Sequence, residues 1–502
     1  MPNQMPINHP NHSKPHLILV PLMAQGHMIP MVDLAGLLAA AGAFVTFITT
    51  PVNAARIRPV IHRIERSGLP VQFVELCFPA VEAGLPAGCE NIDLIPSPDL
   101  FKPFMESLSL LGPQLKLHLA ASSAPPPDCI VFDSLNSWAS TVAKELGVPH
   151  LMFYGPSCFY ILCSLLLKKN QVLKTIADDF ELFPVPGLPE PVEVMKAQVF
   201  RWMDRPGWEK ISEEFYAAEE SAQGIIMNTF EELESSGLEV YRREMGKTIW
   251  PVGPLSLYNK DVESQAVRGN ASSVDTQLLV NWLESKEPKS VMFVSFGSLA
   301  RNPFSQLVEI GRGLKSALSS LSSLSFIWVV KEVEKGGEAK KWMSEFEAEI
   351  EGRGMVIQGW APQELILTHV AVGGFMTHCG WNSTLEALAT GVVMATWPRF
   401  GDQFLNEKLV VDVLKVGVAV GAKIPTLFVN EMSEEAQVKG EKVRKAVVEV
   451  MDGGKEGEAR RRRAGELKEK ARTATEEGGS SSENLKDIIR FAKQKISACD
   501  EA

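Results

Sequence analysis

The chain has 502 residues, of which 45% are hydrophobic and 22% charged, and its formal net charge is -11 at pH 7. A chain of this length usually divides into two domains, each with its own hydrophobic core. The negative charge excludes nucleic acid and an anionic membrane as main partners, because both call for a basic face.

The seven cysteines are scattered along the chain and include no C-x-x-C pair. This usage is typical of reduced thiols in a cytoplasm rather than of a disulfide framework or a zinc site. The longest mostly apolar run, residues 159–167, is far shorter than the roughly 18–20 residues of a membrane span. The polar segment before residue 16 lacks an apolar signal region. We therefore expect a cytoplasmic protein with no stable membrane insertion.

Short β-branched and aromatic runs alternate with helix-length segments in both halves of the chain. Such alternation predicts βαβ units and parallel sheets. Two such series predict an α/β protein with two doubly wound, Rossmann-like domains. The expected strands are residues 17–21, 44–49, 71–76, 129–133, 150–154 and 225–228 in the first half, and 290–296, 326–330, 355–358, 374–377 and 392–397 in the second.

A polar segment that starts with Pro251, Gly253 and Pro254 separates the two series. It has few large apolar residues as far as residue 273, which is typical of an interdomain linker. The expected boundaries are a first domain over residues 1–252, a linker over 253–275, a second domain over 276–480 and a final helical segment over 481–502.

A histidine, His27, stands where the first strand gives way to a helical pattern. Ligands of open α/β sheets bind outside the carboxyl ends of the strands, and an imidazole there can act as a base near neutral pH. The alternative is a histidine that only packs at the turn or caps the helix. The segment holds no G-x-G-x-x-G, which argues against a nicotinamide dehydrogenase.

Asp133 ends a strand whose apolar character predicts burial. Its carboxylate would point into the same cleft, where it could fix the tautomer of His27 and stabilise the imidazolium. The alternative is an N-cap for the helix expected from about residue 137. No G-x-S-x-G motif accompanies the pair, so serine-based hydrolysis is not favoured.

In the second domain, a glycine-flanked group of polar residues follows an expected strand. His378, Trp381 and Asn382 lie at the start of a helical pattern, so the helix should direct its free N–H groups into the cleft. Such a helix start, with hydroxyls and His378 beside it, is suited to phosphate. The alternative is a capping box formed by Ser383 and Glu386, which needs no ligand.

Two further features flank this group. Trp360 lies in an expected loop, where its indole could stack on a base, although an isolated Trp more often belongs to the core. Asp402 and Gln403 follow another strand, and their carboxylate and amide could bind vicinal sugar hydroxyls. The order along the chain is therefore that of a site for a base, a diphosphate and a sugar.

From Trp360 to Gln403 the sequence reads WAPQELILTHVAVGGFMTHCGWNSTLEALATGVVMATWPRFGDQ. This segment closely resembles, without a gap, the signature box of the plant secondary-product UDP-glycosyltransferases of glycosyltransferase family 1. The resemblance covers nearly the whole chain, because it extends through HMIPMVDLAGLL, EAGLPAGCENIDLIPS and SVMFVSFGS. It implies the GT-B fold, in which the two domains face a cleft and the last helix packs back on the first domain.

The resemblance also implies a set of donor-binding residues. Trp360 would stack on uracil, and the Ala361 backbone and Gln363 would help to hold the nucleoside. Glu386 would accept hydrogen bonds from the ribose hydroxyls. The residues implied for the diphosphate are Ser298, His378, Asn382 and Ser383, and those implied for the sugar are Trp381, Asp402 and Gln403.

In the same way, His27 matches the family's general base and Asp133 its partner carboxylate. His27 would remove the acceptor's hydroxyl proton during in-line attack on the anomeric carbon, giving a β-glucoside with inversion. UDP-glucose would be the donor substrate, because a Gln at position 403 resembles glucose users. We expect no cofactor and no metal site, since no D-x-D motif occurs.

The acceptor is expected to be a small hydrophobic plant metabolite such as a flavonoid, another phenol, a triterpenoid or a steroid. Its pocket is expected around Met28 and residues 85–95 and 153–159. We also expect a monomer. Two alternatives remain open, namely another UDP-sugar such as xylose, galactose or glucuronic acid, and a protein that binds a UDP-sugar without turnover.

Overall fold

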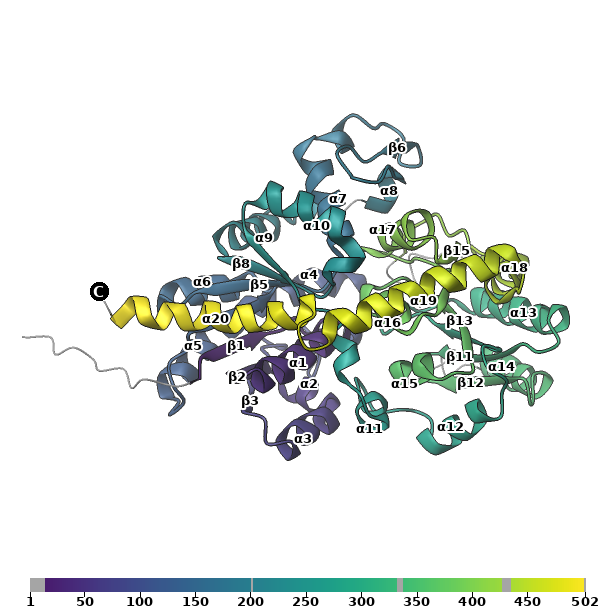
Figure 1. The fold of residues 1–502 in the computed structure, drawn as a ribbon, viewed down its shortest axis with the longest axis horizontal. Coiled ribbons are helices and arrows are strands. Elements are labelled where there is room, and N and C mark those ends of the chain that lie inside the picture. The colour runs from purple at the N-terminus through teal and green to yellow at the C-terminus, as the bar shows by residue number, and fades with distance from the viewer. Residues whose placement is uncertain (1–13, 200–201, 332–336, 427–434, 501–502) are drawn as a thin grey trace, which may run out of the picture.

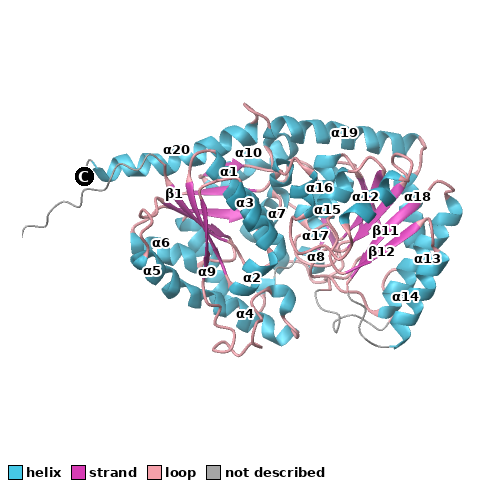
Figure 2. Cartoon of the chain, turned by 90° about the horizontal axis from the view of Figure 1, so that it is seen from below, coloured by secondary structure: helices cyan, strands magenta, loops and turns pink. Residues whose placement is uncertain are grey.

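The computed structural model describes residues 14–199, 202–331, 337–426 and 435–500, and it consists of two α/β halves side by side (Figure 1). Each half has a central sheet with helices on both faces (Figure 2). The expectation of two doubly wound domains is therefore confirmed. Among the described helices, none combines the length and the apolar character that crossing a membrane demands.

The sheet of the first half has seven parallel strands in the order β3-β2-β1-β4-β5-β8-β9. Its central strands are continuous apolar runs that are buried at every residue, as in sheets covered on both faces. The strands are β1 (His16–Val20), β2 (Phe44–Thr49), β3 (Val71–Glu75), β4 (Cys129–Asp133), β5 (His150–Tyr154), β8 (Gly224–Met227) and β9 (Thr248–Pro251).

The sheet of the second half has six parallel strands in the order β12-β11-β10-β13-β14-β15. Its centre is closely packed, since the rings of Phe293 on β10 and Phe375 on β13 stack with centroids 5.0 Å apart. The strands are β10 (Val291–Ser295), β11 (Ser325–Val330), β12 (Gly354–Gln358), β13 (Val372–Thr377), β14 (Val393–Thr396) and β15 (Gly417–Ala419).

The predicted strands are found within a few residues of their expected bounds, but four short strands were missed. β9 and β15 are the last strands at one edge of each sheet, and β6 (Leu182–Pro184) pairs with β7 (Glu193–Met195) in a separate antiparallel hairpin. Strands this short carry too few residues for a recognisable pattern and depend on their neighbours for pairing.

Helices connect the strands in both halves. Those of the first half are α1 (Gln25–Ala40), α2 (Pro51–Arg56), α3 (Arg58–Arg66), α4 (Phe101–Ser107), α5 (Leu111–Ala121), α6 (Trp138–Leu146), α7 (Cys158–Lys169), α8 (Lys196–Val199), α9 (Glu209–Ser221) and α10 (Glu231–Met245). Those of the second half are α12 (Thr276–Glu284), α13 (Phe304–Ser320), α14 (Gly337–Glu349), α15 (Gln363–Thr368), α16 (Trp381–Thr390), α17 (Gln403–Lys408) and α18 (Gly440–Met451).

Between the halves, the chain forms the 3₁₀ turn η6 (Leu255–Tyr258) and the short helix α11 (Val262–Ala266). The remaining 3₁₀ turns are η1 (Ile92–Leu94), η2 (Pro98–Leu100), η3 (Leu108–Leu110), η4 (Val172–Lys174) and η5 (Trp202–Asp204), and a π-helical turn, η7 (Leu409–Val413), follows α17.

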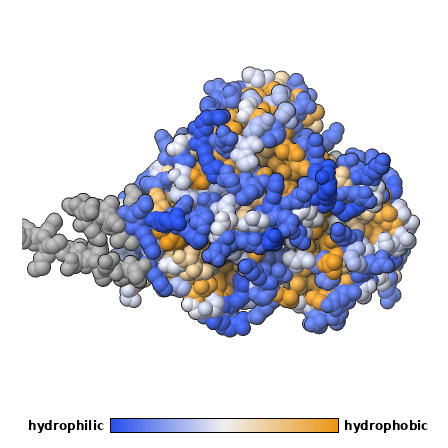
Figure 3. All heavy atoms as spheres, in the orientation of Figure 1, coloured by the Kyte–Doolittle hydropathy of each residue, from blue (hydrophilic) through white to orange (hydrophobic). Residues whose placement is uncertain are grey.

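Two long helices end the chain. α19 (Lys455–Thr475) lies on the second half, and α20 (Ser480–Asp500) runs on across the first half (Figure 1). The hydroxyl of Ser481 donates to the carbonyl of Gly253 over 2.5 Å, and Asn484 donates to the carbonyl of Pro251 over 2.7 Å. The face of the molecule along which both helices run is mostly hydrophilic, with separate hydrophobic patches (Figure 3).

Candidate functional site

The first half contributes a histidine–aspartate pair. β1 and β4 are parallel neighbours, so the first turn of α1 after β1 comes close to the end of β4. Nδ1 of His27 lies 2.7 Å from Oδ2 of Asp133, whose side chain is fully buried, whereas the His27 side chain is 24% exposed. The other Asp133 oxygen accepts from the backbone N–H of Leu135 over 3.0 Å. An ionised Asp133 therefore holds the proton on Nδ1 and leaves Nε2 as the basic nitrogen.

The structure contradicts the alternative that Asp133 caps the following helix. α6 begins at Trp138 and its N-cap residue is Ser137. The Asp133 carboxylate is instead shared between His27 and a local turn. The pair has the geometry of a base and its orienting carboxylate.

Electrostatics adjust the basicity of His27. Burial disfavours its charged form, but the charge and hydrogen bond of Asp133 and the more distant charge of Asp402 outweigh burial and raise the pKa of His27 above its ordinary value of 6.5. Burial also raises the pKa of Asp402 to about 6, against the hydrogen bond from Asn406 and the charge of His27. Since Asp402 belongs to the second half, the two halves act on one another at this point.

We expect kcat/KM for glycosyl transfer, the reaction that the sequence predicts, to rise with pH through the pKa of His27. The reason is that a general base acts only in its neutral form. The midpoint should lie above 6.5. Asp133→Asn removes the charge that favours the imidazolium, so the midpoint should fall by about one unit or more. Rate measurements over a pH series test this, with Asp402→Asn as the control that should move the midpoint less. An unchanged midpoint in Asp133→Asn would assign the profile to another group.

In the second half, His378 stands in a cradle of two glycines. A Cβ atom at Gly297 would lie 2.5 Å from the His378 ring, and one at Gly380 would lie 2.4 Å from it. Only glycine at both positions leaves room for the ring. Burial and the charge of Arg399 lower the pKa of His378 to about 4, so the ring is neutral at physiological pH. Its Nδ1 has no hydrogen-bond partner among the described residues.

Gly380→Ala should displace the His378 ring and weaken UDP binding by about tenfold, the loss of one good hydrogen bond to a charged group. The backbone of Gly380 has φ -58 and ψ 138, which alanine adopts freely, so the steric effect stands alone. Calorimetric titration with UDP measures the change. Gly36→Ala in α1, where the added Cβ meets nothing within 4 Å, is the matched control. Unchanged affinity in Gly380→Ala would show that the ring does not contact the nucleotide.

The N-terminus of α16 joins the two halves. The helix begins at Trp381, and Gly380 is its N-cap. The indole N–H of Trp381 donates to the carbonyl of Asn228 over 2.7 Å, and Asn382 donates to the carbonyl of Gly26 over 2.6 Å. Asn228 in turn donates to Asn382 over 3.2 Å. The positive end of this helix therefore lies next to the turn that carries His27.

The capping-box alternative is not what the structure shows. No side chain caps α16, and the Ser383 hydroxyl instead accepts from Gln363 Nε2 over 3.0 Å. The same Nε2 donates to Glu386 Oε2 over 2.7 Å. Gln363, Ser383 and Glu386 are therefore brought together, in a form that leaves the first N–H groups of α16 available to an anion.

The loop before α15 contains Trp360, which is half-buried, and Ala361, which is buried. Ser273 of the linker holds the backbone of this loop, since its hydroxyl accepts from the N–H of Trp360 and its N–H donates to the Trp360 carbonyl, both over 2.8 Å. Ser298 lies just beyond β10, where its carbonyl accepts from the Lys331 ammonium. Burial, followed by the charge of Arg301, lowers the pKa of Lys331 to about 8.

Asp402 and Gln403, the residues expected to bind the sugar, lie at the start of α17, where Asp402 is the N-cap residue. The side-chain Oε1 of Gln403 accepts from the backbone N–H of Arg399 over 2.8 Å and from that of Phe400 over 3.1 Å. Oδ2 of Asp402 accepts from Asn406 Nδ2 over 2.7 Å. Asn406 also accepts from the hydroxyl of Ser157 over 2.8 Å, and this bond connects α17 to the start of α7 in the first half.

Sequence reasoning missed Arg399. This side chain is 2% exposed, and its guanidinium lies 5.7 Å from the ring centres of Phe296 and Trp397. It donates to the carbonyl of Arg301 over 3.3 Å and to Asn302, but it has no carboxylate partner within the described parts of the chain. Burial lowers its pKa to about 10, so it stays charged. The available signal was an arginine as the single charge between Glu386 and Asp402.

Comparison with known proteins shows the family of the chain. Residues 15–257 match the family model described as glycosyltransferase, N-terminal domain, and residues 247–455 match that of UDP-glucoronosyl and UDP-glucosyl transferase. UDP-glycosyltransferase 73C6 of Arabidopsis thaliana is 44% identical over 486 residues, which cover 95% of this chain and 97% of that protein.

Among solved structures, Glycyrrhiza uralensis UGT73P12 complexed with glycyrrhetinic acid 3-O-monoglucuronide superposes with a TM-score of 0.88 at 35% identity, covering 97% of this chain and 98% of that one. Medicago truncatula UGT71G1 complexed with UDP-glucose gives a TM-score of 0.75 at 26% identity, covering 95% and 98%. The chain therefore belongs to the plant UDP-glycosyltransferase family and is a glycosyltransferase of the GT-B fold.

Proposed function

We propose that this glycosyltransferase moves glucose from UDP-glucose to a hydroxyl group of a small hydrophobic plant metabolite, with inversion at the anomeric carbon. The observation that carries the proposal is the His27–Asp133 pair, whose Nδ1–Oδ2 distance is 2.7 Å, next to the N-terminus of α16. Flavonoids, other phenols, triterpenoids and steroids are the acceptor classes proposed. The proposed setting is the cytoplasm, which is supported by six free cysteines among the described residues.

In this reaction Nε2 of His27 takes the acceptor's hydroxyl proton as the oxygen forms its bond to the anomeric carbon. The bond from that carbon to the UDP oxygen breaks, and its electron pair leaves with the diphosphate. Asp133 stabilises the imidazolium, and such general-base catalysis contributes roughly 10²–10⁴-fold. The helix start, His378 and Arg399 stabilise the negative charge on the leaving group. The uncapped N-terminus of α16 and the charge of Arg399 close to His378 support this assignment.

On the donor side, the proposed arrangement follows the chain. Trp360, Ala361 and Gln363 hold the nucleoside, with Glu386 on the ribose. The diphosphate is assigned to Ser298, His378, Asn382 and Ser383, and the glucose to Trp381, Asp402 and Gln403. The half-buried indole and the buried carboxylate of Glu386 support this order.

The test is transfer of label from UDP-glucose to a panel of flavonoid, terpenoid and steroid acceptors by the purified protein. UDP-xylose, UDP-galactose and UDP-glucuronic acid compete in the same assay, since UGT73P12 was solved with a monoglucuronide. We expect UDP-glucose to give the highest kcat/KM and the product to be the β-anomer by NMR. A preference for another donor would overturn the glucose assignment, and retention of configuration would overturn the mechanism. UDP-sugar binding without transfer to any acceptor would favour a non-catalytic role.

We further propose that the reaction needs no metal ion, because neutral and cationic protein groups surround the proposed diphosphate position. Activity should therefore change less than about twofold after dialysis against EDTA, since the helix N-terminus and the Arg399 charge stay in place. The assay compares EDTA-treated protein with and without added Mg²⁺. A loss of activity that Mg²⁺ restores would show that a metal is required.

We also propose that the protein is a monomer. Gel filtration with light scattering tests this.

A further inference from the structure

The interdomain linker lies against the residues proposed to hold the nucleoside. Arg268 pairs with Glu386, and Gly269 lies against the Trp360 indole, where an added Cβ would be 2.4 Å from Cζ2 of the ring. Gly269 has φ +98, so only glycine makes this approach without strain. With the two hydrogen bonds of Ser273 to the Trp360 backbone, the linker contacts both the proposed base-stacking and ribose-binding residues.

Arg268 is the centre of a buried ion cluster. Its side chain is 9% exposed, and Nε lies 2.9 Å from Oδ2 of Asp33 and 3.5 Å from Oε2 of Glu364. Nη1 pairs with Oε1 of Glu386, and the three carboxylates are each 5% or 6% exposed. Asp33 belongs to α1 of the first half, whereas Glu364 and Glu386 belong to α15 and α16 of the second. One linker side chain therefore connects both halves at the proposed ribose position.

Charges within the cluster are largely compensated. Burial raises the pKa of Glu364 to about 9 against the charge of Arg268, so this residue is protonated at neutral pH. Burial acts against the charge of Arg268, but Asp33, Glu386 and Glu364 outweigh it and raise its pKa. Burial likewise raises the pKa of Asp33, against the charge of Arg268. Nε of Arg268 faces Asp33 and Nη1 faces Glu386, and a planar fork suits this bridging geometry.

The consequence for Glu386 is a fixed orientation. Arg268 holds Oε1, and Gln363 holds Oε2 through a hydrogen bond of 2.7 Å. A carboxylate offers about four acceptor positions, two on each oxygen. Each oxygen therefore retains acceptor capacity in a plane that the protein sets in advance, which is the requirement for two vicinal hydroxyls.

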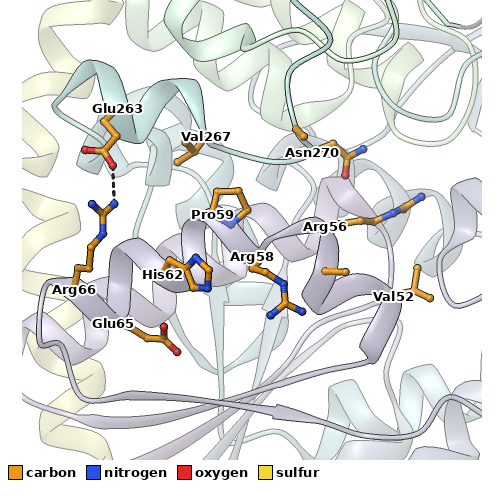
Figure 4. Close-up of a pocket in the computed structure, with 12 residues that line it drawn as sticks. Val52, Arg56, Arg58, Pro59, His62, Glu65, Arg66, Glu263, Val267 and Asn270 are labelled. Atoms are coloured by element: carbon orange, nitrogen blue, oxygen red, sulfur yellow. Dashed lines mark hydrogen bonds and ion pairs between the residues drawn. The ribbon is translucent and has the colours of Figure 1, made fainter.

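The linker also separates this site from an outer cavity of about 1180 Å³ (Figure 4). Val267 and Asn270 line that cavity, together with residues of α2 and α3 such as Arg56 and His62. It includes none of the positions expected for the acceptor pocket. At one end Arg66 and Glu263 form an exposed ion pair of 2.6 Å between α3 and the linker helix α11, far more solvated than the Arg268 cluster.

We propose that Arg268 is a positioning residue for the donor, which orients Glu386 for the ribose hydroxyls and, through Asp33, makes ribose recognition depend on contact between the two halves. The inference rests on the proposed function in one respect, the placement of the ribose at Glu386. The nucleotide is recognised by this chain through its hydroxyls as well as its base.

The test compares the affinities of UDP and 2′-deoxy-UDP in calorimetric titrations of wild type, Arg268→Met, Arg268→Lys and Arg66→Met. Wild type and Arg66→Met should prefer UDP by about tenfold or more, the effect of one hydrogen bond to a charged group. Arg268→Met should lose most of this preference through weaker UDP binding, while its affinity for 2′-deoxy-UDP changes little. Arg268→Lys should be intermediate, because it keeps the charge without the planar fork. Thermal unfolding checks that each variant folds. If Arg268→Met does not fold, Arg268→Lys provides the test.

Equal weakening of both nucleotides in the Arg268 variants would assign the residue a structural role only and overturn the inference. So would a wild-type protein that does not discriminate between the two. These outcomes are separate from the proposed function, because neither nucleotide carries a sugar to transfer. A protein that shows the expected ratios but transfers no glucose would sustain the inference and overturn the proposed function.

Discussion

His27→Ala should lower kcat for glycosyl transfer by about 10²–10⁴-fold and leave the affinity for UDP within about twofold. The reason is that Nε2 acts on the acceptor proton, whereas the proposed UDP contacts lie in the second half of the chain. Product formation under donor saturation gives kcat, and calorimetry gives the UDP affinity. His62→Ala is the matched control, because His62 is an exposed histidine of α3 that lines only the outer cavity.

Asp133 should act through the same pathway. Asp133→Asn offers an amide N–H to Nδ1, which favours the tautomer with the proton on Nε2 and leaves only the minor tautomer to act as base. Its loss of kcat should therefore approach that of His27→Ala, and the double variant should lose little more, as residues that act as a unit are not additive. A loss of kcat in the double variant equal to the product of the two single losses would contradict the joint action of His27 and Asp133. A near-normal kcat in His27→Ala would contradict the role of His27 as the base.

Arg399→Met should weaken UDP binding by about tenfold to a hundredfold and leave uridine binding nearly unchanged, because the guanidinium would add charge near the proposed diphosphate position but not near the proposed nucleoside position. The ligand-free variant should be at least as stable as wild type. Arg399 has no carboxylate partner among the described residues, so its removal strands no buried anion and relieves the desolvation of a cation.

Titrations with UDP and uridine, and thermal unfolding with and without UDP, measure these effects. The increase in thermal stability on adding UDP should be smaller in Arg399→Met than in wild type, although the ligand-free variant is no less stable. Arg312→Met provides the control, since Arg312 is an exposed residue of the same half that pairs with Glu309. Parallel losses of uridine and UDP affinity would instead indicate a distorted pocket.

The sequence is informative where local pattern and tertiary role coincide. The apolar runs of β1, β4 and β10 predict buried parallel strands, and the candidate residues His27 and Asp133 are predicted from their places after β1 and at the end of β4. β9 and β15 could not be predicted in this way, because strands such as TIWP and GVA are three or four residues long and form by pairing at an edge.

Interactions between distant parts of the chain were also beyond the sequence. Arg268 and Asp33 are 235 residues apart, and Arg268 and Glu386 are 118 apart. The polar composition of residues 253–275 predicts a connection between domains, but it is equally typical of a passive spacer. Only the packing of α1, α15 and α16 around one guanidinium shows that Arg268 contacts both halves.

The final pair of helices brings the two connections between the halves together. The chain passes between the halves twice, once after η6 and once between α19 and α20, and η6 packs against both α1 and α19. Ser481 and Asn484 bond to the carbonyls of Gly253 and Pro251, so the two crossings lie side by side. The covalent connections between the halves are therefore gathered at one place, and away from it the halves meet through side-chain hydrogen bonds such as those of Asn382 and Ser157.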